Sequence, residues 1–181
     1  MSRAARAVAG RDMSLTGVSR TFKEDEIIVS KTDNKGIITY ANELFLSIAD
    51  YTQEEILGKP HSIIRHPHMP KAIFKLLWSQ VRSGKEIFAY VVNRTKYGDH
   101  YWVMAHVTPS FDNTGNVIGF HSNRRVPTRS ALAVIEPLYR TLKAAEDKAS
   151  SPQEAMEAST NILMNLLKEK GKSYDEFILS L

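Results

Sequence analysis

Short runs of β-branched residues alternate along the chain with stretches in which apolar residues recur at helical spacing. Near the start, the runs at residues 26–31 and 37–41 flank the tight-turn sequence DNKG, which predicts a β-hairpin. Further along, the turn sequences KYGD and DNTGN separate three longer runs, at residues 86–95, 100–111 and 117–126. The pattern therefore predicts two strands at the beginning of a domain and three at its end.

Between these two groups of strands the pattern is helical. Asn42 precedes the sequence ELFLSIADY and Thr52 begins a capping box, so each predicts the start of a short helix. After Pro70, the sequence KAIFKLLWSQVRSG places its apolar residues on one face, and Gly84 ends that helix. Strands on both sides of a helical stretch predict an α+β fold, in which one five-stranded antiparallel sheet carries short helices on one face.

The last third of the chain is predicted to be helical throughout. Residues 130–149 form one amphipathic stretch, in which Pro137 predicts a kink or a new start. Ser151 begins another helix that ends at Gly171, and a capping box at Ser173 begins the last one. We expect four parts: an arm over residues 1–22, a domain over 23–127, a helix over 128–149 and a helical extension over 150–181.

Composition and charge narrow the function classes. The chain of 181 residues contains no cysteine, which excludes disulfides, thiol nucleophiles and cysteine-ligated metal centres and fits a reducing cytoplasm. No apolar run approaches the length needed to span a bilayer, so we expect a cytoplasmic protein without membrane insertion. The net charge is +4, and four arginines against one aspartate make residues 1–22 basic. A basic arm suits nucleic acid or an anionic membrane, but we expect a flexible terminus and no nucleic-acid binding.

The sequence PHSIIRHPHMP, residues 60–70, concentrates the candidate chemistry. Three of the chain's six histidines lie there: His61, His66 and His68. A metal site is not favoured, because no histidine pair has ligand spacing on a strongly predicted helix. Catalysis is not expected either, since Ser62 beside His61 does not form a nucleophile–base pair and no glycine-rich phosphate loop is present. Arg65 and His66 lie between prolines and need polar partners, which favours a ligand-binding role.

Several motifs, in this order, resemble the PAS sensor domain of bacterial aerotaxis receptors. They include TDNKGIITYAN, LFLSIADYTQEEILGKPHSIIRHPHMP, LLWSQVRSGKEIF, NRTKYGDHYWV and VTPSF, and SALAVIEPLYRTLKAAE resembles the helix that follows the domain in that family. The resemblance covers about residues 23–147, and His68 replaces the acid of the family's usual Arg-His-Pro-Asp motif. It implies a PAS fold and a noncovalently bound FAD that reports redox state or oxygen supply to a chemotaxis receptor.

Residues that match the family's flavin-pocket positions are predicted to bind the cofactor: Asn42, His61, Arg65, His66, Phe74, Trp78 and Asn93. Arg65 offers a rigid fork of donors to a phosphate or a flavin carbonyl. The two asparagines offer both a donor and an acceptor, and Phe74 and Trp78, four positions apart on one helix, can wall a flat ring. Simpler roles stay open: Asn42 as a helix cap, Arg65 as the partner of a carboxylate, and the two aromatic residues as ordinary core.

The sequence leaves several functions open. We expect a redox sensor, not an enzyme, that binds FAD, signals to a separate chemoreceptor or kinase, and works as a homodimer. A ligand-free PAS interaction module is the first alternative, because bulky Ile87 and Phe88 stand where they would fill the cavity. A haem-binding sensor is the second, with His61 or His66 as the axial ligand. The apolar stripe of the last helix either docks a partner or folds back onto the domain: Tyr174, Phe177, Ile178 and Leu181.

Overall fold

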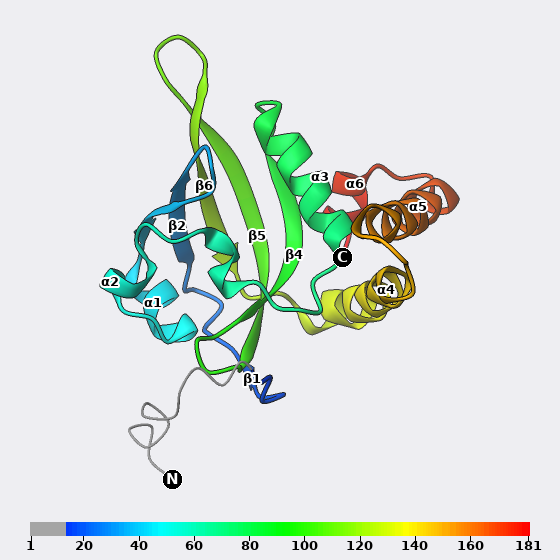
Figure 1. Ribbon diagram of the computed structural model, residues 1–181, viewed down its shortest axis with the longest axis horizontal. Helices are drawn as coiled ribbons and strands as arrows, with labels where there is room; N and C mark the ends of the chain where they lie inside the picture. Colours follow the sequence, from blue (N-terminus) through cyan, green and yellow to red (C-terminus); the bar gives the residue numbers. More distant parts are fainter. Residues whose placement is uncertain (1–13) are drawn as a thin grey trace.

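A five-stranded antiparallel sheet is the frame of the computed structural model, which describes residues 14–181 (Figure 1). Its strands are β2 (Ile28–Asp33), β3 (Ile38–Ala41), β4 (Ile87–Arg94), β5 (His100–Phe111) and β6 (Val117–Arg125). They lie in the order β4-β5-β6-β2-β3, and each neighbouring pair is antiparallel. The predicted α+β fold, with two strands before the short helices and three after them, is confirmed.

Alternation along the strands places one set of side chains on the face that the short helices cover. The register aligns Ala105 of β5 with Arg124 of β6, and Val107 with Ser122. Ser122 in turn lies opposite Ser30 of β2. We call this the inner face of the sheet. The small residues Ala105, Ser122 and Ser30 on this face leave room between the sheet and the helices.

The short helices begin where the sequence predicts caps. α1 (Glu43–Ala49) follows Asn42, whose side chain accepts from the Phe45 N–H, and α2 (Gln53–Ile56) follows the capping box of Thr52. A 3₁₀ turn, η2 (His61–Ile64), comes next, and then α3 (Lys71–Arg82). α3 packs beside β4 and β5, whereas α1 and α2 lie near β2 (Figure 1).

The chain between α2 and α3 runs from one edge of the sheet to the other. Near its start, Pro60 forms a backbone bridge with Ile37, just before β3. Near its end, Arg65 forms a backbone bridge with Asn93 of β4, the strand at the opposite edge. This edge-to-edge segment, residues 58–69, therefore spans the inner face and is tied to both outer strands.

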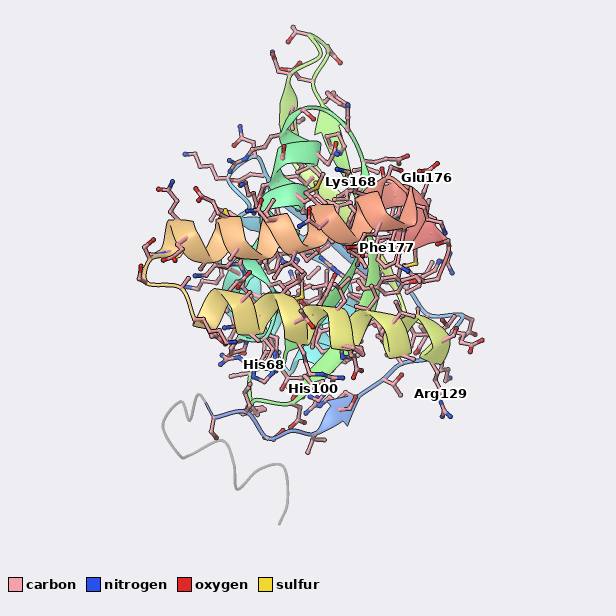
Figure 2. The ribbon with its side chains drawn as sticks, turned by 90° about the vertical axis from the view of Figure 1, so that its right-hand side faces the viewer. His68, His100, Arg129, Lys168, Glu176 and Phe177 are labelled. Atoms are coloured by element: carbon pink, nitrogen blue, oxygen red, sulfur yellow. The ribbon has the colours of Figure 1, made fainter. Side chains whose placement is uncertain are left out.

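Three helices follow the sheet: α4 (Arg129–Asp147), α5 (Pro152–Lys170) and α6 (Tyr174–Leu179). α4 and α5 lie side by side (Figures 1 and 2). α4 is one helix, so Pro137 does not start a new one. Phe177 and Ile178 of α6 are buried and α6 packs against β4, which shows that the apolar stripe folds back onto the domain. Within the described range, no helix is long and apolar enough to cross a bilayer.

The arm predicted to be flexible over residues 1–22 needs correction where the structure describes it. β1 (Ser19–Arg20) pairs in parallel with the start of β5 and so adds a short sixth strand to the sheet. The Arg20 guanidinium forms ion pairs with Asp50 at 2.5 Å and with Asp99 at 2.8 Å. Two carboxylates therefore balance the charge of Arg20, which the sequence predicts to belong to a free basic arm. The rest of that arm, residues 1–13, lies outside the described residues.

Candidate ligand-binding cavity

A cavity of about 320 Å³ separates the inner face of the sheet from α3 and the edge-to-edge segment. Small-molecule sites usually have volumes of about 300–1,000 Å³, so this one is large enough to hold much of a ligand. Apolar and aromatic side chains form much of its lining: Phe74, Leu77, Trp78, Val81, Val91, Ala105, Val107 and Phe120. Polar side chains make up about half of the lining residues, and such groups orient a bound molecule.

Five of the seven predicted site residues line this cavity: His61, Arg65, Phe74, Trp78 and Asn93. Phe74 and Trp78 project from consecutive turns of α3, because residues four apart share a helix face. The guanidinium carbon of Arg65 lies 3.7 Å from the centre of the Phe74 ring. The Trp78 ring meets Phe120 edge-on, with 5.5 Å between ring centres. The two aromatic residues therefore combine the predicted roles of core and cavity wall.

Asn42 does not belong to the cavity lining. Its Oδ1 accepts from the N–H of Val29 at 3.0 Å and of Phe45 at 3.1 Å. Its Nδ2 donates to the carbonyl oxygen of Ile27 at 2.8 Å. These bonds join β2 to the start of α1, so the helix-cap role accounts for this side chain and the predicted ligand contact is not supported.

His66 lies on the other side of the edge-to-edge segment, away from the cavity. The backbone bridge between Arg65 and Asn93 holds the segment extended along β4, so consecutive side chains point to opposite sides. The His66 ring lies 4.8 Å from that of His68 and 5.8 Å from that of His100, measured between centres. Burial first, then these two imidazoles, lower the pKa of His66 to about 4.

The three outer histidines line a separate hollow between the sheet and α4. Figure 2 shows His68 and His100 near each other beside α4. Across residues 14–181, no three side chains of histidine, aspartate or glutamate are placed to hold a metal ion. The replacement of an acid by His68 therefore alters this outer cluster and not the cavity lining.

Arg124 is a buried, charged residue of the cavity lining, and it is absent from the predicted site. It is 4% exposed and lies on the inner face of β6. Its Nη2 donates to Nε2 of His61 at 2.7 Å and to Oγ of Ser30 at 2.9 Å. His61 is therefore neutral, with its proton on Nδ1.

Burial dominates the protonation of this pair. Burial and the adjacent Arg124 guanidinium lower the pKa of His61 to about 3. Burial also lowers the pKa of Arg124 to about 10, so the guanidinium stays charged at neutral pH. The cavity thus contains a fixed positive charge that is held in place by a neutral imidazole and a hydroxyl group.

Three buried polar atoms of the lining have no hydrogen-bond partner within the described residues: Asn93 Nδ2, Ser122 Oγ and Arg124 Nη1. A buried polar group without a partner costs about 1–3 kcal/mol, and native proteins keep few of them. Among residues 14–181, the lining also contains four cationic side chains and no carboxylate: Lys35, Arg65, Arg82 and Arg124. The cavity therefore suits a ligand that has hydrogen-bond acceptors and negative charge.

Ile87 and Phe88 do not fill this space. Phe88 faces the outer side of β4, where its ring stacks on His106 with 4.2 Å between centres and 4° between planes. Ile87 is 1% exposed and packs in the core outside the cavity lining. The suggestion that these bulky residues replace a ligand is thus wrong for this structure.

Part of the chain is similar to known proteins. Residues 38–124 match the family model described as the PAS fold. The chain is 40% identical over 130 residues to the aerotaxis receptor of Escherichia coli (strain K12). The matched residues make up 72% of this chain and 26% of the receptor. It is 31% identical over 80 residues to phototropin-2 of Oryza sativa subsp. japonica, 44% of this chain and 9% of that protein. The chain thus spans about a quarter of the receptor's length.

A solved structure supports the architecture. The dark structure of the blue-light photoreceptor Aureochrome1 LOV superimposes with a TM-score of 0.54 at 20% sequence identity. The match covers 61% of this chain and 82% of that one. At this identity the likeness bears on the fold alone.

Proposed function

Residues 38–124 form a PAS domain, and on this premise we propose that the protein is a sensor that binds FAD noncovalently in its cavity and responds to redox state. The set of unpartnered donors in the cavity carries this proposal, because it calls for a ligand rich in acceptors. The 40% identity to a protein named as an aerotaxis receptor supports the same conclusion.

FAD fits the residues that are present. Its ring system has carbonyl oxygens and ring nitrogens, which are suitable partners for Asn93, Ser122 and Arg124. Phe74 and Trp78 offer flat apolar surfaces against which the ring would pack. The positive charge that a pyrophosphate needs would come from three further lining residues: Lys35, Arg65 and Arg82.

Bound FAD would supply a centre that takes up electrons, and the chain's own groups would respond to the change of charge. Arg124 holds a positive charge, and no carboxylate in the described part of the lining balances it. His61 stays neutral, because its protonation would place two cations 2.7 Å apart. A change of charge in the cavity would therefore act on Arg124, whose contacts with His61 and Ser30 join β6 to η2 and β2.

The absence of cysteine excludes one way in which a flavin could be retained. With no thiol in the chain, no carbon–sulfur bond to the flavin can form. In the noncovalent complex that we propose, retention would depend on the hydrogen bonds and ring contacts described above. Unfolding should therefore release the cofactor intact.

The two alternative functions receive less support from the cavity. A haem iron would need a free histidine nitrogen, but Nε2 of His61 already accepts from Arg124, and His66 faces away from the cavity. A ligand-free interaction module would leave water as the partner of the three unpartnered atoms of the lining.

We further propose a chemoreceptor or a kinase as the partner, and a homodimer as the working form. The likeness to an aerotaxis receptor supports the first part. Light scattering of the purified full chain tests the second: a monomer at all concentrations measured would contradict it.

A visible spectrum of the purified full chain, before and after reduction with dithionite, tests the cofactor. We expect flavin absorption that bleaches on reduction, and release of FAD after heating. An intense haem band would favour the haem sensor. A colourless protein that takes up no added FAD would refute the flavin proposal.

A further inference from the structure

α3 begins without a side-chain cap from its own sequence. Pro70 precedes it and makes no capping hydrogen bond. The first N–H groups of a helix have no partner within the helix, so they need one elsewhere. The Lys71 N–H donates to Oε1 of Glu146 at 2.6 Å, across 75 positions of sequence. A residue in the last turn of α4 therefore caps α3.

A buried carboxylate makes this contact strong and sensitive to distance. Glu146 is 5% exposed, and its Oε2 has no partner within residues 14–181. The N-terminus of a helix carries partial positive charge, which together with the Lys71 N–H offsets the burial of the carboxylate. A displacement of α3 by about 1 Å would lengthen the contact beyond a hydrogen bond.

Two turns earlier on α4, Tyr139 makes a matching contact with the sheet. Residues seven positions apart lie on the same face of a helix. The Tyr139 hydroxyl donates to the backbone carbonyl of Tyr90 on β4 at 2.7 Å. Its ring packs against Trp102, with 5.8 Å between centres. The same face of α4 thus holds the backbones of β4 and α3.

These two contacts reach both structural elements that border the cavity at this edge of the sheet. β4 contributes Val91 and Asn93 to the lining, and α3 contributes Phe74 and Trp78. We propose that Tyr139 and Glu146 form a two-point latch through which the C-terminal helices respond to the separation of α3 and β4. Because α4 is one continuous helix, a shift of α3 relative to β4 must strain or break one of the two hydrogen bonds.

The latch would pass such a shift to α5 as well. α5 packs against both α3 and α4. If α4 moves away from α3 or β4, the surface formed by α4 and α5 therefore changes as well. The latch itself is a property of the chain's own residues. Only its response to FAD rests on the proposed function.

Hydrogen exchange on the full chain tests the latch without any ligand. In Glu146→Ala, the amides at the start of α3 should exchange about tenfold faster than in wild type, as expected for a lost helix cap. Glu146→Gln keeps an oxygen that can accept from Lys71, so its rates should stay within about threefold of wild type. The neighbouring Asp147 is exposed, and Asp147→Ala is the matched control. Equal α3 rates in Glu146→Ala and Asp147→Ala would overturn the latch.

A second comparison adds FAD. In wild type, FAD should change the exchange rates in α4. In Tyr139→Phe combined with Glu146→Ala, that change should fall at least about fivefold while the absorbance shows that FAD is still bound. An undiminished response in the double variant would overturn the coupling. If wild type binds no FAD, the proposed function fails, and the α3 rates still decide the latch.

Tyr139→Phe covers the case in which Glu146→Ala does not fold. This variant removes one hydroxyl group and leaves the ring against Trp102 in place. We expect its α4 amides to exchange at least about fivefold faster than those of wild type, because a buried hydrogen bond is lost. Unchanged α4 rates would count against the contact with β4 as part of the latch.

Discussion

Replacing His61 with glutamine should make the folded protein less sensitive to acid. In the folded state Nε2 of His61 accepts from Arg124 at 2.7 Å, and its pKa is lowered to about 3. In the unfolded chain a histidine titrates near pH 6.5, or about 3.5 units higher. Below about pH 6.5 the unfolded state therefore binds a proton that the folded state does not bind, so the free energy of unfolding falls as the pH falls through this window.

The magnitude follows from the width of the window. Each pH unit well inside the window removes about 1.4 kcal/mol, and near pH 6.5 the loss is about half as steep, because the unfolded histidine is only half protonated there. Acidification from about pH 7 to about pH 4.5 should therefore remove about 2.5 kcal/mol through His61. Glutamine does not titrate, and its amide oxygen can accept from Arg124. Both proteins keep His66, whose pKa is lowered to about 4, so its contribution cancels in the difference. Any destabilisation caused by His61→Gln at about pH 7 should therefore shrink by about 2.5 kcal/mol at about pH 4.5.

Urea unfolding followed by circular dichroism at a series of pH values measures this difference. His121→Gln is the matched control, because its imidazole lies on the opposite face of β6 from Arg124. Parallel pH curves for wild type and His61→Gln would refute the reasoning. A ring resonance of His61 that titrates near pH 6 in the folded protein would refute it equally.

Three further substitutions probe separate parts of the structure. Arg124→Met should weaken FAD binding about 10–100-fold in a titration, because a charged hydrogen-bond donor is lost. The neighbouring Arg125 is exposed, so Arg125→Met is the control and should leave FAD binding within about twofold. Gly98→Ala should lower the unfolding free energy by about 1–3 kcal/mol in urea, since φ is +95° and a Cβ would lie 2.1 Å from the Ser14 carbonyl oxygen; wild-type stability would contradict this. Arg20→Met should cost about 1–2 kcal/mol in the same assay, and less in high salt, because its ion pairs are partly exposed to solvent; a larger loss in high salt would contradict the electrostatic explanation.

The strands and helix starts are predictable from the sequence because their signals are local. DNKG makes its turn within four residues, and the caps at Asn42 and Thr52 act on amides three residues away. The resemblance to a known family adds the cavity residues on α3 and β4. These are the parts of the fold that depend on near neighbours or on a shared pattern.

The misplaced and missing residues depend on contacts between distant segments. His66 is predicted to contact the ligand together with Arg65. The backbone bridge between Arg65 and Asn93, however, directs the two side chains to opposite sides of the segment. Arg124 could have been predicted from the sequence, because it alternates with Phe120 and Ser122 along β6 and therefore shares their face of the sheet. This alternation identifies a cavity residue only once the inner face of the sheet is known. Glu146 has no local signal for its role, since its partner lies 75 positions away.

Because residues 58–69 pair with both outer strands, neither edge of the sheet is open along its whole length to a strand of another molecule. Pro60 occupies the edge beside β3 and Arg65 the edge of β4, against which α6 also packs. Free strand edges are the usual templates for intermolecular β-pairing. A variant that loosens this segment would uncover both edges at once. We expect it to self-associate through its strands, which amyloid-dye fluorescence would report, and not simply to lose its ligand.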